Sequence, residues 1–382
     1  MDAASGSAAV AGGSRTSGSV GGDRRIALFL PSLTVGGAET NLVRLSGVLG
    51  DHGFVPRLIV ASGSGPLREH VPRGVEVVDL GVDRARDAVL PLASYLRVHR
   101  PDGLVSSVEH GSVVALAARA LSRAPTRVVV RVATSLAADR GLGMTGHLAR
   151  RAYPHAAGLI VNTAGGRSEL ARFLDLPVER IAVLPNLTVP EPRADDRVPA
   201  PHPWLGPGGA PVIVSVARLD EVKNPRLLLL AFAALLERRA ARLLFLGDGP
   251  LRTELLGIAN RLGVAAHVDL VGTVTDPRPY VQRARVFCLS SDAEAMPNAM
   301  IEAMAAGVGV VATNCGHGPR ELLADGAHGR LVPRRDVQAM TRALDAALDD
   351  PRPAPASAWS SHTIVNAGRA YAHYLAAVLA TR

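Results

Sequence analysis

The chain has 382 residues, 48% of them apolar, and no run approaches the roughly 18 consecutive apolar residues of a membrane-spanning helix. A chain of this length exceeds what one hydrophobic core usually organises, so we expect a globular protein of two domains. The net charge is +8, but aromatic residues make up only 3%, which argues against the base-stacking surfaces of proteins that bind single-stranded nucleic acid. No nucleic-acid partner is therefore expected.

The positive charge comes from arginine, because Lys223 is the only lysine, and the surplus over acids is concentrated in residues 1–190. That half is predicted to meet an anionic partner such as a membrane surface or a lipid-linked phosphate; arginines scattered over solvated helix faces explain the surplus equally well. Cys288 and Cys315 are the only cysteines and indicate neither a disulfide framework nor a zinc site. We expect a cytoplasmic protein, with peripheral contact to the inner face of the membrane.

Residues 1–22 consist largely of Ala, Gly and Ser, which predicts a disordered tail and not a signal peptide. From residue 23 onward, apolar runs alternate with segments of helical period, a pattern typical of a parallel sheet covered on both faces. Residues 23–190 are therefore predicted to form a Rossmann-like domain. Its expected strands cover residues 25–33, 55–62, 74–80, 102–108, 127–132, 157–163 and 180–186.

A proline-rich segment without periodicity, residues 191–208, predicts a linker, and the alternation resumes over residues 209–355. The sequence thus predicts an α/β fold of two Rossmann-like domains facing a central cleft, where open α/β sheets bind ligands. Residues 356–382 predict a C-terminal helix that packs back on the first domain. In the second domain, the expected strands cover residues 210–219, 241–247, 267–272, 285–290 and 308–313.

The most informative local pattern is SDAEAMPNAMIEAMAAG, in which seven residues separate Glu294 from Glu302. Pro297 suits the first position of a helix and Gly307 suits its C-terminal cap, so Glu294 is expected just before that helix and Glu302 in its second turn. Free N–H groups at a helix start favour a phosphate, and carboxylates accept hydrogen bonds from sugar or ribose hydroxyls. The segment predicts a nucleotide-sugar site, unless both acids only complement the helix dipole.

A second pattern, SVARLDEVKNP, places Arg218 and Lys223 in a loop after a predicted strand. Two cations there can neutralise a diphosphate, the arginine bidentately and the lysine as a point charge. An ordinary pair of surface charges is the alternative. The presence of the only lysine in this loop favours a binding role.

Two glycine-rich turns also follow predicted strands. In LFLGDGPLRTEL, Gly247 and Gly249 form a tight turn, and Arg252 stands where a dinucleotide fingerprint has its third glycine, which disfavours a nicotinamide oxidoreductase. In LTVGGAETNLVRL, Gly36 and Gly37 let the backbone approach a ligand at the start of a helix. An ordinary tight turn explains that loop equally well on its own.

Together these motifs resemble glycosyltransferase family 4, the retaining enzymes of the GT-B fold, over nearly the whole chain from Arg25. The G-H-G-P-R-E-L-L segment and the G-G-A-E loop look most like members that build bacterial cell-surface polysaccharide. The resemblance rests on the order and spacing of G-G-A-E at residues 36–39, the cations Arg218 and Lys223, G-D-G-P at 247–250, V-x-L-x-G at 268–272, E-x7-E at Glu294 and Glu302, and G-P-R-E-L-L at 318–323.

The resemblance implies a role for each matching residue. Arg218 and Lys223 would bind the donor diphosphate and take up the charge that develops on the leaving nucleotide. Glu302 would hold ribose hydroxyls, and Glu294 would hold hydroxyls of the donor sugar. No metal or other cofactor is implied, since cations can do this work and no D-x-D motif stands at a strand end. The implied donor site comprises Gly36, Gly37, Arg218, Lys223, Gly247, Asn298 and Glu302.

One departure from the family concerns a histidine that many members place after the fourth strand of the first domain. This chain offers Glu109 and His110 in SSVEHGS, while the later strand end RVATSL has Arg131 and no histidine. His110 is the resulting candidate for assisting at the reacting sugar, although a lone histidine in a loop is more often solvated.

The expected function is that of a retaining glycosyltransferase, which would move a sugar from a UDP-sugar or GDP-mannose to a glycan or lipid-linked acceptor. A nucleotide-sugar epimerase of the same fold and a non-catalytic nucleotide-sugar-binding subunit are the alternatives. A glycan phosphorylase is disfavoured, because it needs a pyridoxal-binding lysine and Lys223 already lies in the phosphate loop.

Overall fold

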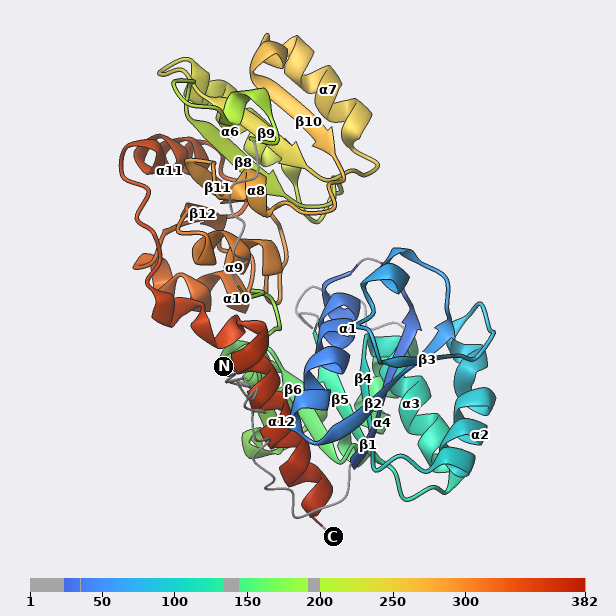
Figure 1. Cartoon of the computed structure of the whole chain (residues 1–382). Helices are drawn as coiled ribbons and strands as arrows, with labels where there is room; N and C mark the ends of the chain where they lie inside the picture. Colours follow the sequence, from blue (N-terminus) through green and yellow to red (C-terminus); the bar gives the residue numbers. More distant parts are fainter. Residues whose placement is uncertain (1–23, 35, 134–143, 192–199, 382) are drawn as a thin grey trace, which may run out of the picture.

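The computed structural model describes residues 24–34, 36–133, 144–191 and 200–381. Within these ranges the chain forms two parallel sheets flanked by helices, one in each half of the chain (Figure 1). The prediction of two Rossmann-like α/β domains is confirmed. The expected tail over residues 1–22 lies outside the described residues, as do residues 192–199 of the expected linker.

The first sheet winds outward in both directions from two neighbouring strands, β1 and β4. In the described residues its strand order is β3-β2-β1-β4-β5-β6-β7, with every pair parallel. Such a reversal of strand order leaves a crevice at the carboxyl ends of the two central strands. The strands are β1 Arg24–Ser32, β2 Phe54–Ser62, β3 Glu76–Asp79, β4 Gly103–Ser107, β5 Arg127–Val132, β6 Gly158–Val161 and β7 Ile181–Val183. The helices are α1 Gly37–Leu49, α2 Val89–His99, α3 Glu109–Ser122, α4 Met144–Ala152 and α5 Ala164–Leu174.

The second sheet repeats this plan around β8 and β11. Its parallel strand order in the described chain is β10-β9-β8-β11-β12-β13. The sequence does not predict β13, which is only three residues long. The strands are β8 Val212–Val216, β9 Arg242–Leu246, β10 Val268–Gly272, β11 Val286–Leu289, β12 Gly309–Thr313 and β13 Arg330–Val332. The helices are α6 Pro225–Leu236, α7 Arg252–Arg261, α8 Arg278–Val281, α9 Asn298–Ala305, α10 His317–Leu322 and α11 Val337–Asp349.

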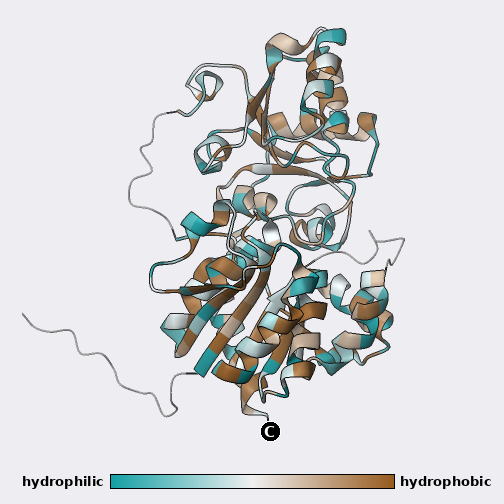
Figure 2. Cartoon of the chain, turned by 90° about the vertical axis from the view of Figure 1, so that its right-hand side faces the viewer, coloured by the Kyte–Doolittle hydropathy of each residue, from teal (hydrophilic) through white to brown (hydrophobic). Residues whose placement is uncertain are grey.

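Both faces of each sheet are buried, which explains why the strands read as continuous apolar runs. In β1, Ile26, Leu28 and Leu30 pack on one face, while Ala27 and Phe29 pack on the other. The second sheet likewise separates two cores. Hydrophobic residues accordingly colour much of the strands in Figure 2. Burial of a large apolar side chain contributes about 1.5–3 kcal/mol, so these layers are the main source of stability.

The last helix, α12 (Ile364–Ala380), lies on the first domain although it follows the second in sequence (Figure 1). It packs against α1 and one face of the first sheet, and its Tyr371 is fully buried. Gly368 permits the close approach, because a Cβ atom there would lie 2.2 Å from Cγ1 of Val48. The chain therefore crosses between the domains twice.

The two crossings lie side by side. The N–H groups of Thr188 and Val189 donate to the carbonyl of His362, and the N–H of Ile364 donates to the carbonyl of Val189. The buried ring of His362 accepts from the N–H of Asn186 through Nδ1, at 3.2 Å. Burial lowers the pKa of His362 to about 4.

Acidification should weaken the protein through His362. Its ordinary pKa is 6.5, so the unfolded chain binds more protons than the native one between about pH 6.5 and 4, and stability falls as the pH decreases through this window. Between about pH 7.5 and 5, this group should cost about 2 kcal/mol of unfolding free energy, measured by urea denaturation. A His362→Asn variant should lack that component; an equal pH dependence in both proteins would contradict the assignment.

Candidate active site

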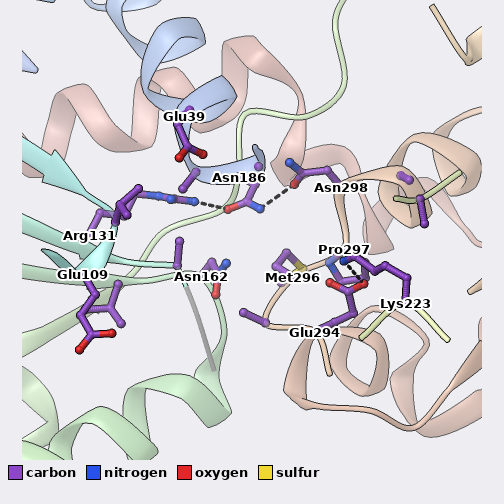
Figure 3. Close-up of a pocket in the computed structure, with 18 of the residues that line it drawn as sticks. Glu39, Glu109, Arg131, Asn162, Asn186, Lys223, Glu294, Met296, Pro297 and Asn298 are labelled. Carbon is purple, nitrogen blue, oxygen red and sulfur yellow. Dashed lines mark hydrogen bonds and ion pairs between the residues drawn. The ribbon is translucent and has the colours of Figure 1, made fainter. Parts of the chain in front are cut away.

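The strand order reverses between β1 and β4 in the first sheet and between β8 and β11 in the second, and both places face one cavity of about 460 Å³. Its walls come from the segments after β1 and β4 in the first domain and after β8 and β11 in the second. Open α/β sheets bind ligands at such places. The polar lining consists of Glu39, Glu109, Arg131, Tyr153, Asn162, Asn186, Lys223, Glu294 and Asn298, all but Tyr153 labelled in Figure 3.

Lys223 and Glu294 form an ion pair on the wall of the second domain. Lys223 Nζ donates to Glu294 Oε1 at 2.7 Å, and the hydroxyl of Ser291 donates to the same oxygen at 2.8 Å. The side chain of Glu294 is 11% exposed and that of Lys223 is 30% exposed. The ammonium has three donors and the carboxylate two oxygens, so both groups keep hydrogen-bonding capacity for a ligand.

The loop that presents Lys223 is held by Asp220 and Asn224. Asp220 accepts from the N–H of Lys223 at 2.9 Å and from Nε of Arg218 at 2.6 Å. Burial opposes ionisation of Asp220, but these hydrogen bonds outweigh it and hold its pKa below the usual range. Asn224 caps α6, since its side chain accepts from the N–H of Leu227. The lysine therefore projects from a well-defined turn.

Helix α9 of the second domain and helix α1 of the first domain begin at the same end of the cavity. Pro297, Asn298 and Ala299 at the start of α9 line it, as do Gly37 and Ala38 at the start of α1. The N–H groups of a first helical turn have no partner within the helix, and the helix dipole adds to their preference for an anion. A Cβ atom at Gly37 would lie 3.4 Å from Nδ2 of Asn298, so the two helix starts nearly touch. Their convergence makes this end of the cavity suitable for a phosphate group.

The first domain contributes Glu109, at the start of α3. The preceding residue, Val108, has φ 71 and ψ 126, a conformation that is costly for a β-branched side chain. Strained backbone of this kind is concentrated at ligand sites. The turn at Val108, between β4 and α3, thus places Glu109 in the cavity wall.

A chain of hydrogen bonds links the two domains across the cavity (Figure 3). Arg131, at the end of β5, donates to Oδ1 of Asn186 at 2.6 Å. Asn186 in turn donates to Oδ1 of Asn298 at 2.7 Å, and the hydroxyl of Thr188 donates to that oxygen at 3.1 Å. The first residue of α9 is therefore held by the first domain.

Four of the residues expected in the donor site or at the catalytic centre line this cavity, namely Gly37, Lys223, Glu294 and Asn298. Gly36 lies immediately before α1. A Cβ atom there would lie 2.2 Å from a carboxylate oxygen of Glu39, so the glycine leaves room for Glu39 to fold back over the helix start.

Arg218 and Gly247 are placed differently from the expectation, since neither is among the cavity residues in the described chain. Asp220 binds the guanidinium of Arg218 at 2.6 Å, and the Arg218 side chain is 75% exposed. Gly247 has φ 135 and is required where the loops after β8 and β9 meet, because a Cβ atom there would lie 2.0 Å from the carbonyl oxygen of Ala217. The expected pair of cations is thus divided, with only Lys223 inside.

His110 is exposed on α3 and lies outside the cavity lining, whereas its neighbour Glu109 is part of it. Consecutive residues at a helix start point in different directions, so one of the two is turned away from the ligand space. The geometry does not support the expectation that His110 assists at the reacting sugar.

Glu302 lines a second cavity, of about 470 Å³, on the linker side of α9. Its carboxylate lies 3.9 Å from the guanidinium of Arg44, and Arg278 lines the same cavity. Burial raises the pKa of Glu302, although the charges of Arg44 and Arg278 act in the opposite direction. Glu294 precedes the helix and Glu302 lies in its second turn, so in this structure the two acids face different spaces.

The sequence motifs assign no role to three other residues of the first cavity's lining, Arg131, Asn162 and Asn186. A signal existed only for Arg131, which interrupts the otherwise apolar run RVVVRV. Within the ranges that the structure covers, no group of three or more His, Cys, Asp or Glu side chains is arranged to hold a metal ion. No helix in those ranges is both long and apolar enough to cross a membrane.

Two family models match the chain, one in each domain. The model for "Glycosyltransferase Family 4" matches residues 35–191, and that for "Glycosyl transferases group 1" matches residues 210–350. Both domains of the chain therefore match families of glycosyltransferases. The chain is similar in sequence to curated glycosyltransferases over less than half of their length.

One relative is the N-acetylgalactosamine-N,N'-diacetylbacillosaminyl-diphospho-undecaprenol 4-alpha-N-acetylgalactosaminyltransferase of Campylobacter jejuni, 36% identical over 138 residues. Another is the lipopolysaccharide core biosynthesis glycosyltransferase LpsE of Rhizobium meliloti, 35% identical over 144 residues. The aligned stretches cover 36% and 38% of this chain, and 37% and 41% of those relatives.

Solved structures share the fold over almost the whole chain. HepE of Anabaena, in complex with UDP and glucose, superimposes with a TM-score of 0.78 at 20% identity, covering 93% of this chain and 100% of HepE. WaaG, a glycosyltransferase involved in lipopolysaccharide biosynthesis, gives a TM-score of 0.64 at 17% identity, covering 91% and 95%. The expected GT-B fold is therefore confirmed.

Proposed function

We propose that this glycosyltransferase transfers a sugar from a nucleotide diphosphate-sugar, either a UDP-sugar or GDP-mannose, to a glycan or lipid-linked acceptor in cell-surface polysaccharide synthesis. The observation that carries the proposal is the convergence of Lys223, Glu294 and the start of α9 on one cavity between the domains. The second domain would hold the donor there. The wall formed by the first domain would receive the acceptor.

In the proposed complex, the donor diphosphate lies at the start of α9 beside Lys223, which takes up the negative charge that develops on the departing nucleotide. Glu294 accepts hydrogen bonds from hydroxyls of the donor sugar. Lys223 and Glu294 form an ion pair at 2.7 Å, so each charge has a partner within the cavity. Arg218 joins the diphosphate by turning away from Asp220. The nucleoside extends past α9 into the second cavity, where Glu302 holds the ribose.

The proposed acceptor follows from the relatives. The names of the two relatives refer to a diphospho-undecaprenol-linked sugar and to lipopolysaccharide core. An anionic membrane is also a fitting neighbour for the arginine-rich first domain, because α4 combines the exposed apolar residues Met144 and Leu148 with Arg150 and Arg151 in its last turn. We therefore propose peripheral attachment at the inner face of the membrane.

A donor screen tests this function. The purified protein would be incubated with UDP-sugars and GDP-mannose in the presence of polyprenyl diphosphate-linked sugars, and the released nucleoside diphosphate would be measured. We expect release with one base, undiminished by excess EDTA, because Lys223 and the start of α9 supply the positive charge that a divalent ion would otherwise provide.

Two outcomes of the screen would contradict parts of the proposal. Isomerisation of a sugar nucleotide without any acceptor would favour the epimerase alternative. Turnover that EDTA abolishes and magnesium restores would show that the leaving group needs a metal.

The product should keep the anomeric configuration of the donor. Inversion needs a general base on the acceptor face, and Glu294 is already held by Lys223 and Ser291 at the donor end. The departing diphosphate can itself accept the proton of the acceptor hydroxyl on the leaving-group face, which retains configuration. The anomeric coupling constant of the product, measured by NMR, checks this; an inverted anomer would instead point to Glu109 as the base.

A further inference from the structure

Arg131 is a charged residue in the core of the first domain. It lies at the carboxyl end of β5, is only 2% exposed and contributes to the cavity lining. Its Nε donates to the hydroxyl of Tyr371 at 2.9 Å, its Nη1 to the hydroxyl of Ser107 at 3.2 Å and its Nη2 to Oδ1 of Asn186 at 2.6 Å. All three partners are electrically neutral.

The charge of Arg131 is not balanced by the protein around it. No carboxylate in the described ranges forms an ion pair with its guanidinium, and Glu39, which lines the same cavity, is folded back over Gly36. Removing an unpaired charge from water costs several kcal/mol, so a buried arginine without a counter-ion is rare unless a ligand supplies the opposite charge.

The position of Arg131 indicates which ligand group that is. Asn186 connects the guanidinium of Arg131 to Asn298, the first residue of α9. Gly37, at the start of α1, lies against Asn298. The guanidinium therefore stands behind the point where the two helix starts converge. It has five N–H donors, of which three are used, so further donors remain for an anion.

We propose that Arg131 is a further cation for the donor diphosphate, supplied by the first domain and opposite Lys223. This inference rests on the proposed function, since it requires a nucleotide diphosphate in the cavity. Closure of the two domains would then enclose the diphosphate between a cation from each, and the buried position of Arg131 protects its charge from screening by salt.

The rival explanation is that Arg131 only ties together β4, the interdomain connection and α12 through its three hydrogen bonds. Two conservative variants separate these roles. Arg131→Lys keeps the charge but cannot satisfy all three partners, whereas Tyr371→Phe removes one partner and leaves the charge and shape of Arg131 intact. A third variant, Arg131→Met, removes the charge.

The test measures the affinities of UDP, GDP, uridine and guanosine by calorimetry for the unaltered protein and these variants. We expect Arg131→Met to weaken the preferred nucleoside diphosphate by about tenfold or more while the nucleoside binds as before. Arg131→Lys should retain diphosphate affinity within about threefold, and Tyr371→Phe within about twofold, although both lower the melting temperature.

Equal losses for the diphosphate and the nucleoside, or unchanged diphosphate affinity in Arg131→Met, would overturn the inference. If Arg131→Met does not fold, the Arg131→Lys variant decides. In that case, a loss of nucleoside affinity in Arg131→Lys, matched by an equal loss of diphosphate affinity, would favour the purely structural role. Failure of the unaltered protein to bind any nucleoside diphosphate would overturn the proposed function itself, and the inference with it.

Discussion

Replacement of Lys223 by alanine should lower kcat about 100-fold or more. The ammonium stands beside the start of α9, where the proposed diphosphate departs, and loss of one such charge-stabilising donor typically costs about 3 kcal/mol in the transition state. Release of the nucleoside diphosphate at saturating donor gives kcat, and calorimetry gives the accompanying loss of nucleoside diphosphate affinity.

Controls for this variant must separate catalysis from folding, because removal of Lys223 leaves the mostly buried Glu294 without its ion-pair partner. The double variant Lys223→Ala, Glu294→Gln should recover the lost melting temperature and remain inactive. Arg226→Ala removes a nearby cation that pairs with Glu221 and Glu254 outside the cavity, and should leave kcat unchanged. Normal turnover in Lys223→Ala would exclude this loop from the site.

Replacement of Glu294 by glutamine should lower kcat/KM about 10- to 100-fold. A hydrogen bond to a charged group contributes about 1.5–3 kcal/mol, and the proposed partner of Glu294 is a hydroxyl of the donor sugar. The affinity for the nucleoside diphosphate alone should stay the same or rise, because Lys223 is then released from its ion pair.

Glu254→Gln is the matched control for this change, since Glu254 pairs with Arg226 away from the cavity. It should behave as the unaltered enzyme. If Glu294→Gln weakened the nucleoside diphosphate as strongly as the sugar nucleotide, Glu294 would belong to the phosphate site and not to the sugar site.

The fold could be predicted because its signals are local. Each buried strand is visible in the sequence as an apolar run of a few residues, as RVVVRV is for β5, and the alternation of such runs with helices implies parallel pairing. Helix α9 begins at Asn298, one residue after the start that Pro297 predicts.

Side-chain direction within the site was harder to predict, because it depends on competition between partners. Arg218 and Lys223 share one loop, yet Asp220 binds the guanidinium of Arg218 while Glu294 draws Lys223 inward. The spacing of Glu294 and Glu302 fixes their separation along the chain, but the cavity that each faces depends on where α9 sits between the domains.

The contacts of Arg131 are non-local. Its partners Ser107, Asn186 and Tyr371 are 24, 55 and 240 residues away, so no motif window contains them. The sequence shows only that an arginine interrupts an apolar strand. At the guanidinium of Arg131, three segments meet: β4, the interdomain connection and α12. They meet there because α12 packs on the first domain, which the sequence around Arg131 does not show.

A crystal structure with the nucleoside diphosphate found by the donor screen would show where the donor binds. We expect the diphosphate to lie within hydrogen-bonding distance of the first-turn N–H groups of α9 and of Nζ of Lys223, in the cavity between the two sheets. A nucleotide bound elsewhere, or one whose phosphates point away from Lys223 and α9, would contradict this expectation.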